Sequence, residues 1–185
     1  MNVNIYDFDG TIYRGDSTFD FYMYCLRKRP YIIVFWPLIL IAALLWAVKL
    51  INKTKMKRVL YLYFYIVDVE KLVPEFWKEA MKNIYPWYYE RHTENDVVVS
   101  ASPEFSLKYP CEKLGIKKLI CTVVDAGTGK HITENCSGPE KKKRFLAEFP
   151  EAHVDNAYYD KDRDLFVSRL AGHKYRIVHG KSVEE

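Results

Sequence analysis

The chain has 185 residues, of which 49% are hydrophobic and 28% charged, and its net charge is +4. This length fits one domain, or one domain with a small insert, and the composition excludes a disordered chain. The basic residues fall in three separate clusters, at 27–29, 49–58 and 141–144, so no nucleic-acid partner is predicted. None of the four cysteines has C-x-x-C spacing, which argues against a zinc or dithiol site. No signal peptide is expected, so reduced thiols in the cytoplasm are the default.

The first half of the chain begins with a predicted strand, Val3 to Phe8, which ends in the turn Asp9-Gly10. A helix capped by Asp16 or Ser17 is predicted up to about Arg29, because Pro30 then breaks it. Residues 31–48 follow without a single charge, and 18 residues are close to the lower limit for a membrane-spanning helix. A second apolar stretch, 59–67, is too short to span a bilayer.

A further helix is predicted to begin at Pro74 and to stop at Pro86. The second half alternates strands and helices. Strands are predicted at 96–99, 119–124, 154–159 and 175–178, and helices at 103–115, 139–149 and 162–172. This alternation predicts an α/β fold with a Rossmann-like, doubly wound parallel sheet.

Residues able to do chemistry stand where the predicted strands end. Asp7 and Asp9 close the first strand, Ser100 closes the next, and Asp160 closes a later one, while Lys141 opens a helix. Because the carboxyl ends of parallel strands share one edge of a sheet, these side chains are expected to converge. Each motif alone could be a turn, a helix cap or a solvated basic face. Together they indicate a site where carboxylates hold Mg²⁺ and a hydroxyl and an ammonium hold a phosphate.

In combination, Asp7-Phe8-Asp9-Gly10-Thr11, Ser100, Lys141, Asp160 and Asp164 resemble the haloacid dehalogenase superfamily, in its phosphoserine-phosphatase-like branch. The resemblance implies that Asp7 attacks phosphorus and that Asp9 is the general acid and base. It further implies that the substrate phosphate is bound by Thr11, Ser100, Ala101 and Lys141. Mg²⁺ would be bound by Asp7, by Asp160 and by the backbone carbonyl of Asp9, which leaves the Asp9 side chain free, and Asp164 would orient Lys141 or metal-bound water. Lys142 is the alternative phosphate lysine, because an apolar residue is common at its position.

The same resemblance implies that the segment after the first strand forms a small helical cap. The predicted organisation is therefore a catalytic core of residues 1–15 and 92–185, with residues 16–91 as a strongly apolar insert.

A narrower resemblance concerns the apolar insert after Arg29-Pro30, the run Ser100 to Pro103 and the run Cys136 to Lys141. These features are similar to the membrane-associated phosphatidylglycerophosphate phosphatases of the superfamily. They imply a lipid phosphomonoester as substrate. The alternatives are a phosphatase of a soluble phosphomonoester such as phosphoserine, and a non-enzymatic membrane scaffold on the same fold.

The charge-free residues 31–48 raise a question of topology. Asp7 precedes this segment and Lys141 follows it, so both ends must lie on one side of a membrane, which argues against a single span. We expect a re-entrant or in-plane element, for example a helical hairpin bent at Pro37, with residues 49–58 at anionic headgroups. Aromatic residues that suit the interface are Tyr31, Trp36, Trp46 and the run Tyr61 to Tyr65. The protein would then lie on the cytoplasmic face of the membrane. The alternative is a buried cap core or dimer interface in a cytoplasmic protein, and the sequence makes no prediction of oligomeric state.

Overall fold

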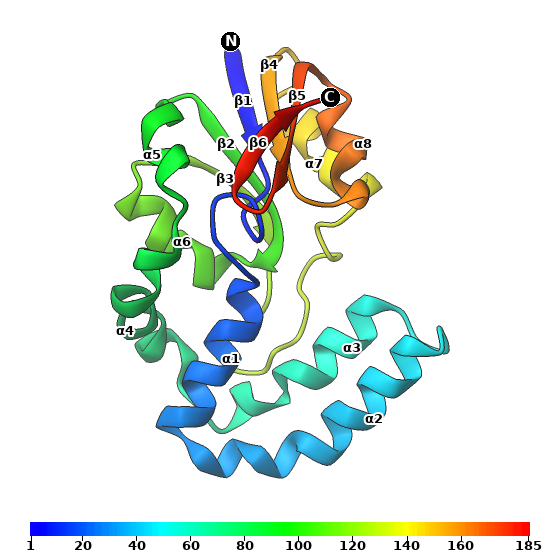
Figure 1. The fold of residues 1–185 in the computed structure, drawn as a ribbon. Helices are drawn as coiled ribbons and strands as arrows, with labels where there is room; N and C mark the ends of the chain where they lie inside the picture. The colour runs from blue at the N-terminus through cyan, green and yellow to red at the C-terminus, as the bar shows by residue number, and fades with distance from the viewer.

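The computed structural model describes residues 1–185, which fold around one six-stranded sheet (Figure 1). The strands are β1 (Asn2–Tyr6), β2 (Asp96–Pro103), β3 (Lys118–Thr122), β4 (His153–Tyr159), β5 (Ala171–Val178) and β6 (Lys181–Glu184). Their order is β3-β2-β1-β4-β5-β6, and all neighbours are parallel except β5 and β6. The predicted α/β, doubly wound parallel sheet is confirmed.

Successive residues of the central strands supply two separate cores, as the two-residue period of a strand requires. Tyr6 and Val98 belong to the larger cluster of buried side chains, and Ile5 and Val97 to the smaller. The larger core is covered by α4 (Val69–Ala80), α5 (Pro86–Arg91) and α6 (Glu104–Lys113). The smaller is covered by α7 (Pro139–Glu148) and α8 (Leu165–Ser168), on the opposite face of the sheet (Figure 1).

Part of the predicted insert, 16–91, packs on the sheet and on the neighbouring helix α6. The ring of Tyr88 in α5 meets that of Tyr6 edge-on at 5.2 Å, and the indole N–H of Trp77 in α4 donates to the carbonyl of Ser106 at 2.7 Å. The remaining helices form a cap beyond the carboxyl ends of the strands (Figure 1). They are α1 (Ser17–Lys28), the 3₁₀ turn η1 (Pro30–Phe35), α2 (Trp36–Ala47), α3 (Lys53–Leu60) and the 3₁₀ turn η2 (Tyr61–Tyr65).

Side-chain caps fix the helix starts in this region. Asp16 accepts a hydrogen bond from the Phe19 amide at 3.1 Å, which confirms the predicted start of α1. Asn52 caps α3 in the same way, by accepting from the Lys55 amide at 2.9 Å. Between α2 and α3 the chain reverses direction, at residues 48–52 (Figure 1).

Two predictions about this region are wrong. The hairpin does not bend at Pro37, because proline is well accommodated in the first turn of a helix and here occupies the start of α2. Most of the aromatic run at 61–65 does not lie at an outer surface, and only its last residue, Tyr65, is largely exposed, at 55%. Tyr61, Tyr63 and Phe64 are buried in the larger core, where Tyr61 and Phe64 stack with their ring centres 5.0 Å apart.

Three element boundaries also differ from prediction. Helix α4 begins at Val69 rather than Pro74, because Asp68 caps it by accepting from the Lys71 amide at 3.3 Å. A 3₁₀ turn, η3 (Met81–Asn83), separates it from α5. The predicted helix 162–172 is only η4 (Asp162–Asp164) and α8, since β5 already begins at Ala171. Strand β6 was not predicted at all.

Candidate active site

The predicted catalytic residues meet where the order of the strands reverses. Strand β1 lies between β2 and β4, and Asp7 and Asp160 directly follow β1 and β4. Such a point is where open α/β sheets bind ligands. Gly10 makes the approach of the two strand ends possible, because a Cβ at this position would lie 2.2 Å from Oδ2 of Asp160. Its φ of +81° also favours glycine.

Lys141 forms the centre of a buried ion-pair network. Its Nζ lies 2.7 Å from Oδ1 of Asp7 and 2.6 Å from Oδ1 of Asp164, and all three side chains are at most 6% exposed. Burial disfavours the charged ammonium, but the two carboxylates outweigh this effect and raise the pKa of Lys141. The structure thus places Lys141, rather than Lys142, against Asp7, and gives Asp164 the contact with Lys141 that the sequence predicted.

Three carboxylates gather around this lysine. Single oxygens of Asp7, Asp160 and Asp164 lie within 4.8 Å of one another. Burial, with Asp7 as the next cause, raises the pKa of Asp160 and also that of Asp164. Oδ1 of Asp160 is buried without a hydrogen-bond partner.

This donor set fits Mg²⁺, which prefers hard carboxylate oxygens and would relieve the repulsion among them. The structure therefore brings together the two predicted carboxylate ligands, Asp7 and Asp160, and adds Asp164 to the cluster of oxygens. The predicted ligand at Asp9 is its backbone carbonyl, and that contact stays a prediction.

The Asp9 carboxylate is held by other partners. Its Oδ1 accepts from the Ser17 amide at 2.7 Å, and its Oδ2 accepts from the Ser102 hydroxyl at 2.5 Å. Ser102 in turn lies 3.0 Å from the Thr18 hydroxyl. Burial and the neighbouring Asp16 raise the pKa of Asp9 to about 6, against the opposing effect of its hydrogen bonds. A carboxyl of this kind can donate and accept a proton near neutral pH.

The other predicted phosphate-binding residues differ in whether their polar groups already have hydrogen-bond partners. The Ser100 hydroxyl is buried and accepts from the Ser102 amide at 3.2 Å, so its own proton is free for a substrate. The Thr11 hydroxyl is buried without a partner. The carbonyl of Ala101 is already engaged by Lys57 Nζ at 2.8 Å and by the Thr122 hydroxyl at 3.1 Å. The phosphate contacts of these residues stay predictions.

The sequence did not identify Lys57 as a residue beside the site. The prediction that residues 49–58 lie at lipid headgroups is wrong for Lys57. The residue is only 7% exposed, and burial together with the nearby Lys53 lowers its pKa to about 8. The spacing of Lys53, Lys57 and Leu60 places all three on one face of a helix. This spacing could have indicated that the two lysines face the cap interior together with Leu60. Ser102 and Thr18 were also missed, because Ser102 was interpreted only as a helix cap.

Known proteins show the same architecture. Residues 5–165 match the sequence model of a family described as haloacid dehalogenase-like hydrolase. No curated protein sequence matches the chain. The structure is similar to that of a protein of unknown function from Bordetella pertussis Tohama I, with a TM-score of 0.76 and 12% identity over 94% of this chain and 88% of that one.

Two further solved structures are similar. One is a probable phosphoserine phosphatase from Vibrio cholerae, with a TM-score of 0.69 and 13% identity over 94% of this chain and 55% of that one. The other is a phosphoserine phosphohydrolase-like protein from Francisella tularensis subsp. tularensis SCHU S4, with a TM-score of 0.62 and 15% identity over 94% of this chain and 86% of that one. At such identities the likeness establishes a shared fold.

Proposed function

Since the chain belongs to the haloacid dehalogenase-like hydrolases, we propose that it is a magnesium-dependent phosphomonoester phosphatase that works through a phosphoaspartate on Asp7. The observation that carries the proposal is the buried Lys141, held between Asp7 and Asp164 at 2.7 and 2.6 Å. A nucleophilic carboxylate needs positive charge around the incoming phosphate, and this lysine supplies it at the nucleophile itself.

The different surroundings of the two aspartates of the first loop support different roles for them. Asp7 attacks phosphorus, and Lys141 stabilises negative charge on the transferring group. Asp9 protonates the leaving oxygen and then takes a proton from the water that hydrolyses the phosphoaspartate. Bound Mg²⁺, held by Asp7, Asp160 and Asp164, would neutralise further charge on the phosphate oxygens.

The cap supports a lipid phosphomonoester, such as phosphatidylglycerophosphate, as the substrate. Residues Pro30–Ala47 form an 18-residue helical stretch that is long and apolar enough to cross a membrane, with a mean hydropathy of 2.2 and only 11% of it buried. In α2, Leu40, Ile41 and Leu44 are 61%, 55% and 64% exposed. A surface of this kind on a folded domain fits contact with lipid or with another protein.

We infer that α2 lies in the plane of the membrane interface rather than across the bilayer. Both of its ends lead back to helices of one cap, α1 and α3, beside a single active site (Figure 1). Exposed basic side chains flank the apolar stretch, with Arg27, Lys28 and Arg29 before it and Lys49 and Arg58 after it. This arrangement suits an anionic leaflet. All four cysteines are free and buried, which accords with the cytoplasmic face.

A soluble phosphomonoester is the second candidate substrate. The similar solved structures from Vibrio cholerae and Francisella tularensis are described as phosphoserine phosphatase and phosphoserine phosphohydrolase-like, and in this respect the comparisons favour the soluble substrate over the lipid.

One assay tests the activity and separates the two substrates. Phosphate release is measured with and without Mg²⁺ on phosphatidylglycerophosphate in mixed micelles, on phosphoserine and on a panel of soluble phosphomonoesters, with Asp7→Asn as the control. Turnover that needs Mg²⁺ and is lost in Asp7→Asn supports the phosphatase. Activity confined to phosphoserine would refute the lipid substrate, and a lack of turnover on every ester would leave a membrane scaffold.

A further inference from the structure

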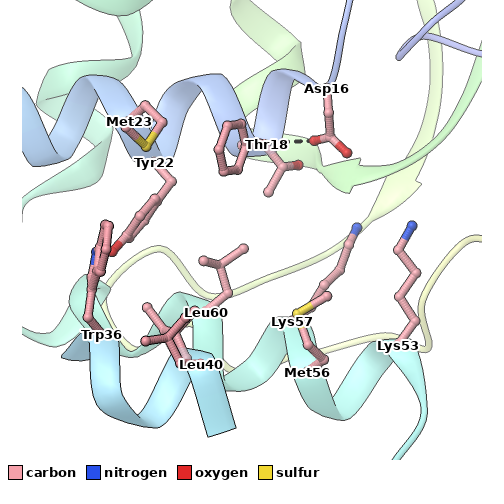
Figure 2. Close-up of a pocket in the computed structure, with 12 residues that line it drawn as sticks. Asp16, Thr18, Tyr22, Met23, Trp36, Leu40, Lys53, Met56, Lys57 and Leu60 are labelled. Carbon is pink, nitrogen blue, oxygen red and sulfur yellow. Dashed lines mark hydrogen bonds between the residues drawn. The ribbon is translucent and has the colours of Figure 1, made fainter. Parts of the chain in front are cut away.

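A pocket of about 430 Å³ lies between α1 on one side and α2 and α3 on the other (Figure 2). Most of the twelve residues that line it are hydrophobic. Its charged side chains, Asp16, Lys53 and Lys57, lie together at one end, and Trp36 and Tyr22 lie at the other (Figure 2). The pocket is therefore polar at one end and apolar at the other.

The polar end borders the catalytic carboxylates. Thr18, which lines the pocket, lies 3.0 Å from the Ser102 hydroxyl, and Ser102 donates to Asp9. Lys57 donates from the pocket wall to the carbonyl of Ala101, the neighbour of Ser100. Asp9 is the group that protonates the leaving oxygen in the proposed reaction. A leaving group attached to that oxygen thus has this pocket directly beside it.

The two lysines at this end have no direct ion-pair partner. Neither Lys53 nor Lys57 takes part in an ion pair. Figure 2 shows both ammonium groups extended from α3 toward the start of α1. The nearby carboxylates already accept hydrogen bonds: Asp16 caps α1, and Asp9 accepts from the Ser17 amide and the Ser102 hydroxyl. Burial lowers the pKa of both lysines, a sign that a bound anion would stabilise them.

The apolar end is continuous with the exposed face of α2. Trp36 and Leu40 line the pocket and are nevertheless 40% and 61% exposed. Leu60 and Tyr22 complete the wall from α3 and α1. A ligand with an acyl chain can therefore follow an unbroken apolar surface outward from the pocket.

We propose that this pocket holds the leaving group, and that Lys53 and Lys57 select substrates with a second negative charge between the scissile phosphate and an apolar chain. The inference rests on the proposed phosphatase function. Charge complementarity selects the anion, because neither lysine forms an ion pair and the carboxylates near them, Asp16 and Asp9, already accept hydrogen bonds. The apolar wall selects the chain. Among substrates of this class are lipid phosphomonoesters that contain a phosphodiester.

The same polar end could hold a zwitterion, with its ammonium on Asp16 and its carboxylate on the lysines, as in phosphoserine. Such a ligand would leave the apolar wall around Trp36, Leu40 and Leu60 without a role. For that reason we assign the pocket to an anionic amphiphile, and phosphoserine serves as the competing substrate in the test.

The kinetic test compares kcat/KM on monomeric short-chain substrates. Dihexanoyl phosphatidylglycerophosphate has the second anion and the chains, dihexanoyl phosphatidic acid has only the chains, and phosphoserine has no chain. The first is expected to be the best substrate. Lys53→Met should lower its kcat/KM by about tenfold to a hundredfold, the value of a charge-assisted hydrogen bond, and change that of phosphatidic acid less than about twofold. Lys78→Met, at an exposed position of α4, is the matched control.

Equal losses on both lipids in Lys53→Met, or a preference for phosphoserine, would overturn the inference. Lys57→Met is a second test, but it also removes the bond to Ala101, so its folding is checked by thermal unfolding. Binding is measured apart from turnover by titrating the wild type with dihexanoyl phosphatidylglycerol and with neutral dihexanoylglycerol. Tighter binding of the anion that disappears in Lys53→Met supports the pocket even if no ester is hydrolysed. Equal binding of both would refute it.

Discussion

The catalytic edge of the sheet and the α2 helix of the cap distribute polarity in opposite ways. At the sheet edge, Asp7, Lys141 and Asp164 are charged and almost fully buried. In α2, by contrast, Ala42 is the only buried residue of a helix that has no charge. Burying charge and exposing apolar surface both oppose stability, so each is expected where function requires it. The comparison suggests that the first region performs the chemistry and the second brings the substrate to it.

If the sheet edge performs the chemistry, the largest effect of a substitution is expected at the nucleophile. Asp7→Asn should lower phosphatase turnover by at least about a thousandfold, since an amide cannot form the phosphoaspartate. Steady-state kinetics with Mg²⁺ measure the effect. Asp162→Asn changes an exposed aspartate near the same site and should keep activity within about twofold. Comparable losses in both variants would show that Asp7 has no special role.

Lys141→Met tests whether the buried network depends on the cation that bridges Asp7 and Asp164. The variant leaves Asp7, Asp160 and Asp164 facing one another, so the free energy of unfolding at pH 7 should fall by about 3–5 kcal/mol. Added Mg²⁺ should restore part of it, because the ion replaces the missing positive charge. Urea unfolding with and without Mg²⁺ measures both effects. The neighbouring Lys142→Met should show neither, and an equal loss there would contradict the assignment.

The role of α2 is tested by charging its exposed face. Ile41→Asp combined with Leu44→Asp should weaken binding to phosphatidylglycerol-containing vesicles by at least about tenfold, because each apolar side chain loses a burial worth about 1.5–3 kcal/mol. Vesicle flotation measures binding, and thermal unfolding should be unchanged. Ile132→Asp, at an exposed apolar position outside the cap, serves as control. Unchanged flotation of the double variant would place the membrane contact elsewhere or nowhere.

The smallest effect is expected for the hydrogen bond that adjusts Asp9. Asp9 must be protonated to donate to the leaving oxygen, so kcat/KM should fall as the pH rises through its pKa of about 6. The Ser102 hydroxyl lowers this pKa, so Ser102→Ala should move the alkaline limb of the pH profile to higher pH. Ser168→Ala, a buried serine far along the chain, should leave the limb in place. A shift to lower pH in Ser102→Ala would contradict the role of the bond.

The two regions also differ in how far the sequence predicts them. The sequence alone could place Asp7 and Asp160 together, because parallel topology brings strand ends to one edge of the sheet. Lys141 was expected at the same edge because it begins a helix of the alternating fold. The burial of Lys57 could not be predicted, because it depends on which face of α3 packs against the end of β2 at Ala101. The same holds for the aromatic run at 61–65, whose apolar composition suits a membrane interface and a protein core equally well.

Strand β6 was missed for a local reason. His179 and Gly180 both have positive φ values, +50° and +78°, and join Val178 to Lys181 in a two-residue turn. Such turns usually contain Asn-Gly or Asp-Gly, so His-Gly gave only a weak indication of a hairpin.

The most direct test of the central claim is to trap the covalent intermediate. The protein is mixed with Mg²⁺ and a hydrolysed phosphomonoester, quenched in acid and treated with borohydride, which reduces an acyl phosphate to the alcohol. Mass spectrometry then identifies the altered residue. The proposed mechanism predicts homoserine at position 7, only when substrate is present, and none in Asp7→Asn. Turnover without modification of Asp7, or modification of another carboxylate, would contradict it.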